Sequence, residues 1–137
     1  MPWVVDTCLL IDVADADPRF GKASSRLIAE RHATGLIISP ISYVELAPAF
    51  DGVLAAQEHF LANLRVEWTE NWTWRDTQLA FEGWAAHIKK RRSPWHGKRP
   101  IADILIGAFA SRFDGLLTRN ARDFEKLFPK LRIQTPK

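Results

Sequence analysis

Short apolar runs alternate with longer stretches of mixed polarity along the 137 residues of this chain. A short apolar run bounded by turn residues is typical of a buried strand, whereas apolar residues that recur every three or four positions predict a helix. Strands that alternate with helices predict a parallel sheet with helices on both faces. By these criteria the predicted strands are residues 3–6, 36–38, 64–68, 116–118 and 131–133.

The segments between the strands carry helical signals. Pro40 and Pro100 each stand at the start of such a segment, which suits proline because the first N–H groups of a helix are unpaired anyway. Gly35 ends another segment, as glycine commonly does after a helix. The predicted helices are residues 19–33, a helix from Pro40 that Pro48 interrupts, and residues 53–63, 73–92, 101–109 and 120–128, with a helical turn at 8–11.

The longest predicted helix, residues 73–92, has one apolar face at helical spacing. Such a face is expected to pack against the rest of the protein or against a second copy of it. Its members are Trp74, Thr77, Phe81, Trp84, Ala85 and Ile88, and the neighbouring Trp72 is expected in the same surroundings.

Together the elements predict one domain over residues 1–137, a three-layer α/β/α sandwich around a central parallel sheet of about four or five strands. The apolar content of 47% suits a globular protein. No apolar run approaches the roughly 20 residues of a membrane helix, and no signal peptide is predicted. Cys8 is the only cysteine, which excludes an intrachain disulfide and is consistent with a cytoplasmic location.

Four acidic residues stand next to the ends of predicted strands or the starts of predicted helices. An α/β sheet gathers such positions at the carboxyl ends of its strands, where these folds bind ligands. Carboxylates gathered in one cleft repel one another unless a cation lies between them, and carboxylate oxygens are the ligands that Mg²⁺ and Mn²⁺ prefer. The four acids are Asp6, Glu45, Asp103 and Asp123.

Each acid also has a purely structural explanation. Asp6 would cap the helix that follows it. Glu45 stands three residues after Ser42, which is the spacing of a capping box. Asp103 and Asp123 would lie in the first turns of their helices, where an acid is favoured by the helix dipole without any ligand.

The four acids occur within sequence segments that resemble those of the PIN-domain ribonucleases, and most closely the VapC toxins of toxin–antitoxin pairs. The segments are Val4-Val5-Asp6-Thr7, Ser42-Tyr43-Val44-Glu45-Leu46, residues 101–108 and residues 117–124. The resemblance spans nearly the whole chain. It implies a central parallel sheet between helices and a protein that is usually dimeric.

The resemblance also implies a metal-dependent endoribonuclease. Mg²⁺ or Mn²⁺ would assist hydrolysis of a phosphodiester bond in an RNA, often a tRNA or rRNA, and a separate VapB-type antitoxin would be the partner. Asp6 and Asp103 are expected as the innermost ligands. The remaining positions that the resemblance matches are Glu45 and Asp123 as further metal-site acids, Thr7 and Thr118 as supporting polar residues, and Asn120 as a competitor of Asp123 for the fourth position.

Positive charge is concentrated in one segment. Residues 89–99 hold six of the nineteen Lys and Arg and no acid, which leaves 13 basic against 16 acidic residues elsewhere. A polyanion that bridges a metal site and a basic segment suits both features. His96, Lys98 and Arg99 are expected to hold the RNA backbone, while Trp95 either stacks on an unpaired base or packs on the protein.

Other residues are expected to be structural. Cys8 has no accompanying His arrangement and is interpreted as a small core residue. The main alternative to an enzyme is a PIN-like module that binds RNA or a protein without cleaving it. The acids interpreted as surface or turn residues are Asp12, Asp15, Asp17 and Asp114.

Overall fold

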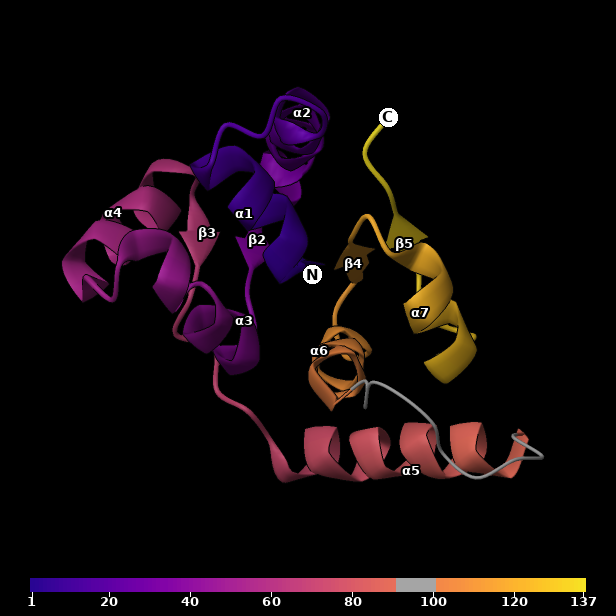
Figure 1. Cartoon of the computed structure of the whole chain (residues 1–137). Coiled ribbons are helices and arrows are strands. Elements are labelled where there is room, and N and C mark those ends of the chain that lie inside the picture. Colours follow the sequence, from indigo (N-terminus) through magenta and orange to yellow (C-terminus); the bar gives the residue numbers. More distant parts are fainter. Residues whose placement is uncertain (91–100) are drawn as a thin grey trace.

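Five short strands form one parallel sheet in the order β3-β2-β1-β4-β5 (Figure 1). The structure is a computed structural model that describes residues 1–90 and 101–137. Trp3 pairs with Leu36 of β2 on one side, and Val5 pairs with Leu117 of β4 on the other, so β1 is the central strand. The strands are β1 (Trp3–Val5), β2 (Leu36–Ile37), β3 (Val66–Glu67), β4 (Gly115–Leu117) and β5 (Ile133–Gln134).

Helices connect the strands and cover the sheet on both faces (Figure 1). The α-helices are α1 (Thr7–Ala14), α2 (Gly21–Arg31), α3 (Pro40–Glu45), α4 (Leu54–Asn63), α5 (Trp74–Lys90), α6 (Ile101–Ala110) and α7 (Ala121–Leu127). Two 3₁₀ segments, η1 (His32–Thr34) and η2 (Ala47–Phe50), follow α2 and α3. Within the described residues the predicted helices and strands are confirmed, with their ends shifted by a few residues. Residues 91–92 of the longest predicted helix and the predicted helix start at Pro100 lie outside the described residues.

The core lies on both sides of β1, because successive side chains of a strand point to opposite faces. Trp3 and Val5 pack in a cluster with side chains of α1, α2 and α4. Val4 packs on the other face, in a cluster with Phe109 of α6 and Phe124 of α7. The α/β/α sandwich with a parallel sheet is therefore confirmed.

The apolar face predicted for the longest helix does not pack as a unit against the rest of the described chain. Trp74 and Phe81 are each 74% exposed and Ile88 is 51% exposed. The buried face of α5 instead carries Ala80 and Gly83, which pack toward α6 and α7. A Cβ added at Gly83 would stand 3.0 Å from the ring of Phe128, so the small residues allow these helices to approach closely.

An ion pair fixes the same buried face of α5. Asp76 is fully buried, and its Oδ1 accepts a hydrogen bond of 3.0 Å from Nε of Arg112. The carboxylate also accepts from the backbone N–H of Thr73, which caps the start of the helix. The pairing with Arg112 offsets the cost of burying the charge of Asp76. Because Asp76 faces inward, the apolar residues at 74, 81 and 88, on the opposite face of the helix, are turned outward.

In the described part of the chain, no helix combines the length and the apolar character needed to cross a membrane.

Candidate active site

Asp6 lies at the carboxyl end of the central strand and is 4% exposed. Its Oδ1 accepts a hydrogen bond of 2.8 Å from the backbone N–H of Thr7, so Asp6 is the N-cap of α1. Its Oδ2 accepts from the hydroxyl of Thr118 at 2.6 Å and from Sγ of Cys8 at 3.4 Å. The structural and the functional interpretations of this residue are thus compatible, since a capping carboxylate retains further lone pairs.

Thr7 joins Asp6 to the second predicted acid, Glu45. The Thr7 hydroxyl donates to Oε1 of Glu45 at 2.6 Å and lies 2.9 Å from the buried Ser42 hydroxyl. Glu45 is the last residue of α3 and is exposed. The capping box expected at Ser42 is not formed, because Ser39 is the N-cap of α3 and accepts from the N–H of Ser42 at 3.1 Å.

Burial raises the pKa of the Asp6 carboxyl above its ordinary value. The hydrogen bonds from Thr118, Cys8 and Thr7 oppose the rise, and the negative charge of Glu45 adds to it. Burial and the charge of Asp6 likewise raise the pKa of the Cys8 thiol to about 12. Cys8 is therefore a protonated hydrogen-bond donor to Asp6 rather than a reactive thiolate.

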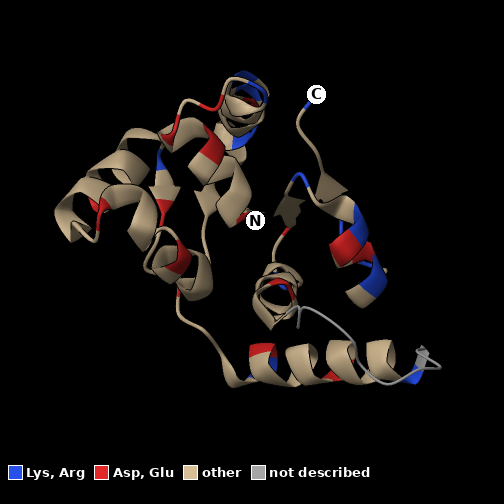
Figure 2. Ribbon diagram, in the orientation of Figure 1, with Lys and Arg blue, Asp and Glu red and all other residues tan. Residues whose placement is uncertain are grey.

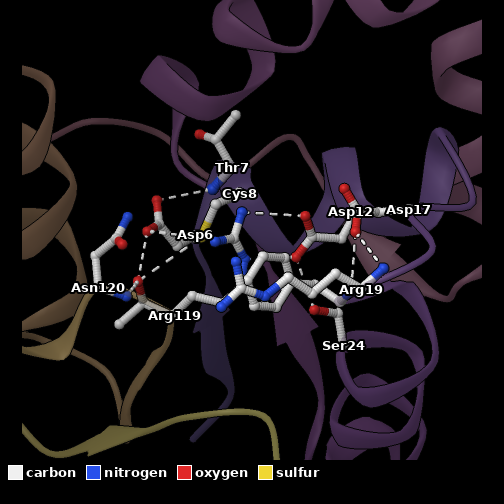
Figure 3. Close-up of polar contacts among 11 residues, drawn as sticks. Asp6, Thr7, Cys8, Asp12, Asp17, Arg19, Ser24, Arg119 and Asn120 are labelled. Atoms are coloured by element: carbon white, nitrogen blue, oxygen red, sulfur yellow. Dashed lines mark hydrogen bonds and ion pairs between the residues drawn. The ribbon is translucent and has the colours of Figure 1, made fainter.

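Thr118 and Asn120 follow β4 and approach Asp6 from the neighbouring strand. Thr118 is fully buried, and its hydroxyl accepts from the backbone N–H of Asn120 at 3.0 Å while it donates to Asp6. This acceptor bond fixes the direction in which the hydroxyl proton points. Figure 3 shows Asn120 beside Asp6 at this end of the sheet.

The ion pair between Asp12 and Arg119, which lies beside the site, was not predicted from the sequence. Asp12, interpreted there as a surface or turn acid, is 3% exposed, and that interpretation is wrong. Its carboxylate accepts from Nε and a terminal nitrogen of Arg119 at 2.7 and 3.1 Å, and from the Ser24 hydroxyl at 2.9 Å (Figure 3). The Arg119 guanidinium also lies 4.1 Å from the centroid of the Phe20 ring. The one available signal was that Asp12 stands three residues after the buried Leu9 on α1.

The other three acids are at the surface or in turns. Asp15 is exposed at the end of α1. Asp17 accepts from the backbone N–H groups of Arg19 and Phe20, each at 2.8 Å. Asp114 lies 3.9 Å from the N-terminal amine.

Asp103 and Asp123 both lie in first turns of helices, of α6 and α7 respectively. Asp103 is half-buried and Asp123 is exposed. Within residues 1–90 and 101–137, no three His, Cys, Asp or Glu side chains form a group that could hold a metal ion. The structure therefore brings Asp6 and Glu45 together, and the gathering of all four acids stays a prediction.

The residues of the basic segment that are expected to contact RNA lie between positions 95 and 99. Trp95, His96, Lys98 and Arg99 all lie outside the described residues. Their role in RNA binding stays a prediction. Trp72, by contrast, is in the core as expected, where it stacks on Phe109 with 6.3 Å between ring centroids.

Comparison with solved structures identifies the fold. The chain superimposes on the crystal structure of VapBC2 from Rickettsia felis bound to a DNA fragment from their promoter, with a TM-score of 0.69, 19% identity and 100% coverage of both chains. It also matches the structure of FitAB bound to an IR36 DNA fragment, with a TM-score of 0.69 and 12% identity over 97% of this chain and 94% of that one.

At the level of sequence, no family model matches the chain, and no curated protein matches it significantly. Identities of 19% and 12% show a shared fold. The chain therefore has, over its full length, the PIN-like fold that its sequence segments predicted.

Proposed function

We propose that this protein is a metal-dependent endoribonuclease and the toxin of a VapBC-type toxin–antitoxin pair. The observation that carries the proposal is a buried carboxylate, Asp6, at the carboxyl end of the central strand of a PIN-like fold. Asp6 is oriented by Thr118 and linked through Thr7 to a second carboxylate, Glu45. Such an end of a parallel sheet is where α/β proteins bind ligands.

The donor set fits a small divalent cation. Mg²⁺ is commonly bound through one or two carboxylates, with waters and substrate phosphate oxygens completing its shell. Asp6 and Glu45 supply the two carboxylates. The negative charge of Glu45 contributes to the raised pKa of Asp6. A cation bound between the two carboxylates would lower that pKa. By the family resemblance, Asp103 and Asp123 would add further oxygens.

The chain's own residues prepare the site for that ion. When bound, Mg²⁺ or Mn²⁺ supplies polarisation of the phosphodiester and a more acidic water for its hydrolysis. The Thr118 hydroxyl holds Oδ2 of Asp6 in one direction, and the Thr7 hydroxyl does the same for Oε1 of Glu45. Asn120 is exposed beside them and offers an amide to orient water or a phosphate oxygen.

Substrate and partners follow from charge and from the likeness to solved toxin–antitoxin structures. The acid-free segment at residues 89–99 favours a polyanion, which we infer to be a tRNA or rRNA. A VapB-type antitoxin would be the protein partner, since the similar structures are of VapBC2 and FitAB. We place the protein in the cytoplasm, as a homodimer.

The test is cleavage of RNA by purified protein freed of any antitoxin. We expect cleavage with Mg²⁺ or Mn²⁺, none with a chelator, and none by Asp6→Asn or Asp103→Asn. Asp15→Asn is the matched control, because Asp15 is an exposed acid at the far end of α1. Cleavage that persists in both site variants, or that survives the chelator, would overturn the proposal.

Two observations make the non-catalytic module the second candidate. Both oxygens of Asp6 already accept hydrogen bonds, and the described residues form no group of three metal ligands. A module would bind RNA with equal affinity in wild type and Asp6→Asn and would cleave in neither. An enzyme would show divalent-ion binding by calorimetry that Asp6→Asn abolishes.

A further inference from the structure

A groove with a cavity of about 620 Å³ lies between α2 and the C-terminal segment that begins with β5. Arg31 contacts Gln134 and Arg26 contacts Lys137, so the groove follows the two elements lengthwise. Figure 1 shows α2 facing the segment after β5. The polar residues that line this α2–β5 groove are Arg26, Glu30 and Arg31 of α2, with Gln134, Thr135 and Lys137 in and after β5.

The groove carries positive charge that the described chain does not neutralise. Arg26, Arg31 and Lys137 supply three cations against the single acid Glu30. Within residues 1–90 and 101–137, none of these four side chains takes part in an ion pair, whereas Arg119 is paired with Asp12. Figure 2 shows Lys and Arg both on α2 and at the end of the segment that follows β5. Cations around one cavity repel one another unless an anion lies between them.

Arg31 is held in place with its terminal nitrogens unused. Its Nε donates to Oε1 of Gln134 at 2.7 Å, and its guanidinium lies 4.9 Å from the centroid of the buried Trp3 ring. Among the described residues, the terminal nitrogens of Arg31 donate to no acceptor. A guanidinium fixed in this way offers a planar pair of donors, which matches two oxygens of a phosphate group. Arg26 uses one terminal nitrogen, which donates to the backbone oxygen of Lys137 at 3.3 Å.

The groove begins one strand away from the proposed active site. The backbone N–H of Thr118 donates to the carbonyl oxygen of Gln134 at 3.0 Å, and the hydroxyl of the same Thr118 holds Asp6. Lys137 follows beyond the carboxyl end of β5, which is the end of the sheet where Asp6 lies. An RNA strand whose scissile bond is at Asp6 must leave the site along the surface, and the groove is an adjacent positively charged path.

We propose that the α2–β5 groove binds phosphate groups of the RNA that flank the bond to be cleaved. The proposal rests on the proposed ribonuclease function and adds a substrate contact made by residues outside the basic segment 89–99. Phosphate oxygens accept hydrogen bonds from the free terminal nitrogens of Arg31 and Arg26 and from the amine of Lys137. Arginine forks beside a site for phosphodiester cleavage favour a nucleic acid over an acidic peptide.

The salt dependence of RNA binding tests the groove without cleavage. A labelled single-stranded RNA is titrated with the full chain in a chelator at several salt concentrations. Arg26→Gln with Lys137→Gln should reduce the magnitude of the slope of log affinity against log salt concentration by about 1.4, because each lost phosphate contact of a single strand contributes about 0.7. Lys22→Gln with Lys130→Gln is the matched control, since both lysines are exposed and neither lines the groove. Equal slopes for the two double variants would overturn the proposal.

Substrate length separates the groove from the metal site. A dinucleotide has one phosphodiester, which the metal site holds, so no phosphate is left for the groove. Arg26→Gln with Lys137→Gln should raise KM for a longer RNA about tenfold at low salt and leave its kcat unchanged. The same variant should cleave the dinucleotide as the wild type does, and an equal loss on both substrates would overturn the proposal. A wild type that cleaves neither would refute the nuclease, while the salt slope would still decide the groove.

The geometry of Arg31 is tested by a variant that keeps its charge. Arg31→Lys removes the planar fork and should weaken RNA binding about tenfold, the equivalent of one lost charge-assisted hydrogen bond, with little change in the salt slope. Thermal unfolding of the variant controls for the loss of the contact with Trp3. Unchanged affinity in a folded Arg31→Lys would show that the fork does not hold a phosphate and would overturn the site.

Competition identifies the source of the phosphate. Unlabelled RNA should displace the labelled strand from the wild type, whereas inorganic phosphate, adenosine monophosphate and polyglutamate at the same charge concentration should not. Displacement by phosphate or the nucleotide as effective as that by RNA would make the groove a site for free phosphate. Equally effective displacement by polyglutamate would make it a site for acidic peptides. Either result would overturn the assignment to RNA.

Discussion

The hydroxyl of Thr118 donates a hydrogen bond of 2.6 Å to Oδ2 of Asp6, and these residues are 112 positions apart in sequence. The contact follows from strand register. Val5 pairs with Leu117 in parallel strands, so the residue after each strand falls beside the residue after the other. The Asp6 N–H also donates to the Leu117 carbonyl at 2.9 Å, which continues the ladder to the site.

Removal of the Thr118 hydroxyl should impair the site without removing a metal ligand. Thr118→Val keeps the shape of the side chain and loses the hydrogen bond that orients Asp6. Loss of such supporting hydrogen bonds typically costs about 10–100-fold in metal affinity or activity. We expect this loss in kcat/KM for RNA, with a matching loss in Mn²⁺ affinity. Thr118→Ser should restore most of both, and a fully active Thr118→Val would show that the bond does not matter.

Asp6→Asn should remove a pH-dependent loss of stability from the metal-free protein while it abolishes cleavage. Because the pKa of Asp6 is raised in the folded state from its ordinary value of 3.8, the folded protein holds the proton more tightly than the unfolded chain does. That contribution to stability is fully present below the unfolded pKa and is lost as pH rises through the folded pKa. The amide carries no charge and avoids this loss.

Urea unfolding at about pH 3 and about pH 7 measures the difference. The free energy of unfolding of Asp6→Asn, taken relative to that of the wild type, should be higher at the higher pH than at the lower one. The amide NH₂ cannot accept the hydrogen bond from Thr118, and this loss is the same at both pH values. Asp15→Asn, at an exposed position, should change stability by less than about 0.5 kcal/mol. A relative stability of Asp6→Asn that does not rise between the lower and the higher pH would contradict the expectation.

The ion pair between Asp12 and Arg119 should be important for stability. Asp12 is 3% exposed and Arg119 28%, so removal of one partner leaves a partly buried charge unpaired. Asp12→Ala and Arg119→Ala should each cost about 3 kcal/mol, and the double variant less than the sum of the two. Chemical unfolding of the four proteins gives this cycle. Additive effects would mean that the pair does not couple α1 to the loop after β4.

Neutralisation of the basic segment should weaken RNA binding in a salt-dependent manner. Each lost contact between a basic side chain and a phosphate reduces the magnitude of the slope of log affinity against log salt concentration by about 1. Lys98→Ala with Arg99→Ala should therefore flatten the slope by up to about 2. The control is Lys22→Ala with Lys130→Ala, which removes the same charge from exposed positions elsewhere. Equal slopes for both pairs would show that the RNA lies elsewhere.

By itself, the sequence determined the order of strands and helices and the position of Asp6. An apolar run followed by an acid indicates the end of a buried strand, and this depends only on neighbouring residues. The same holds for Pro40 at the start of α3 and Gly35 after η1, where φ is +90°. Strand and helix periodicities are local properties, so the chain reveals them without its fold.

Only the tertiary structure decided which face of α5 is buried and which distant residues meet. The face of α5 that carries Trp74, Phe81 and Ile88 is the more apolar one, yet the face with Gly83 and Asp76 is the one that packs inward. Close helix packing requires a small residue, and the buried charge requires Arg112, which is 36 positions away. Asp12 and Arg119 are 107 positions apart and meet because of the order of the strands in the sheet. Contacts between such distant residues produce no periodic pattern in the local sequence.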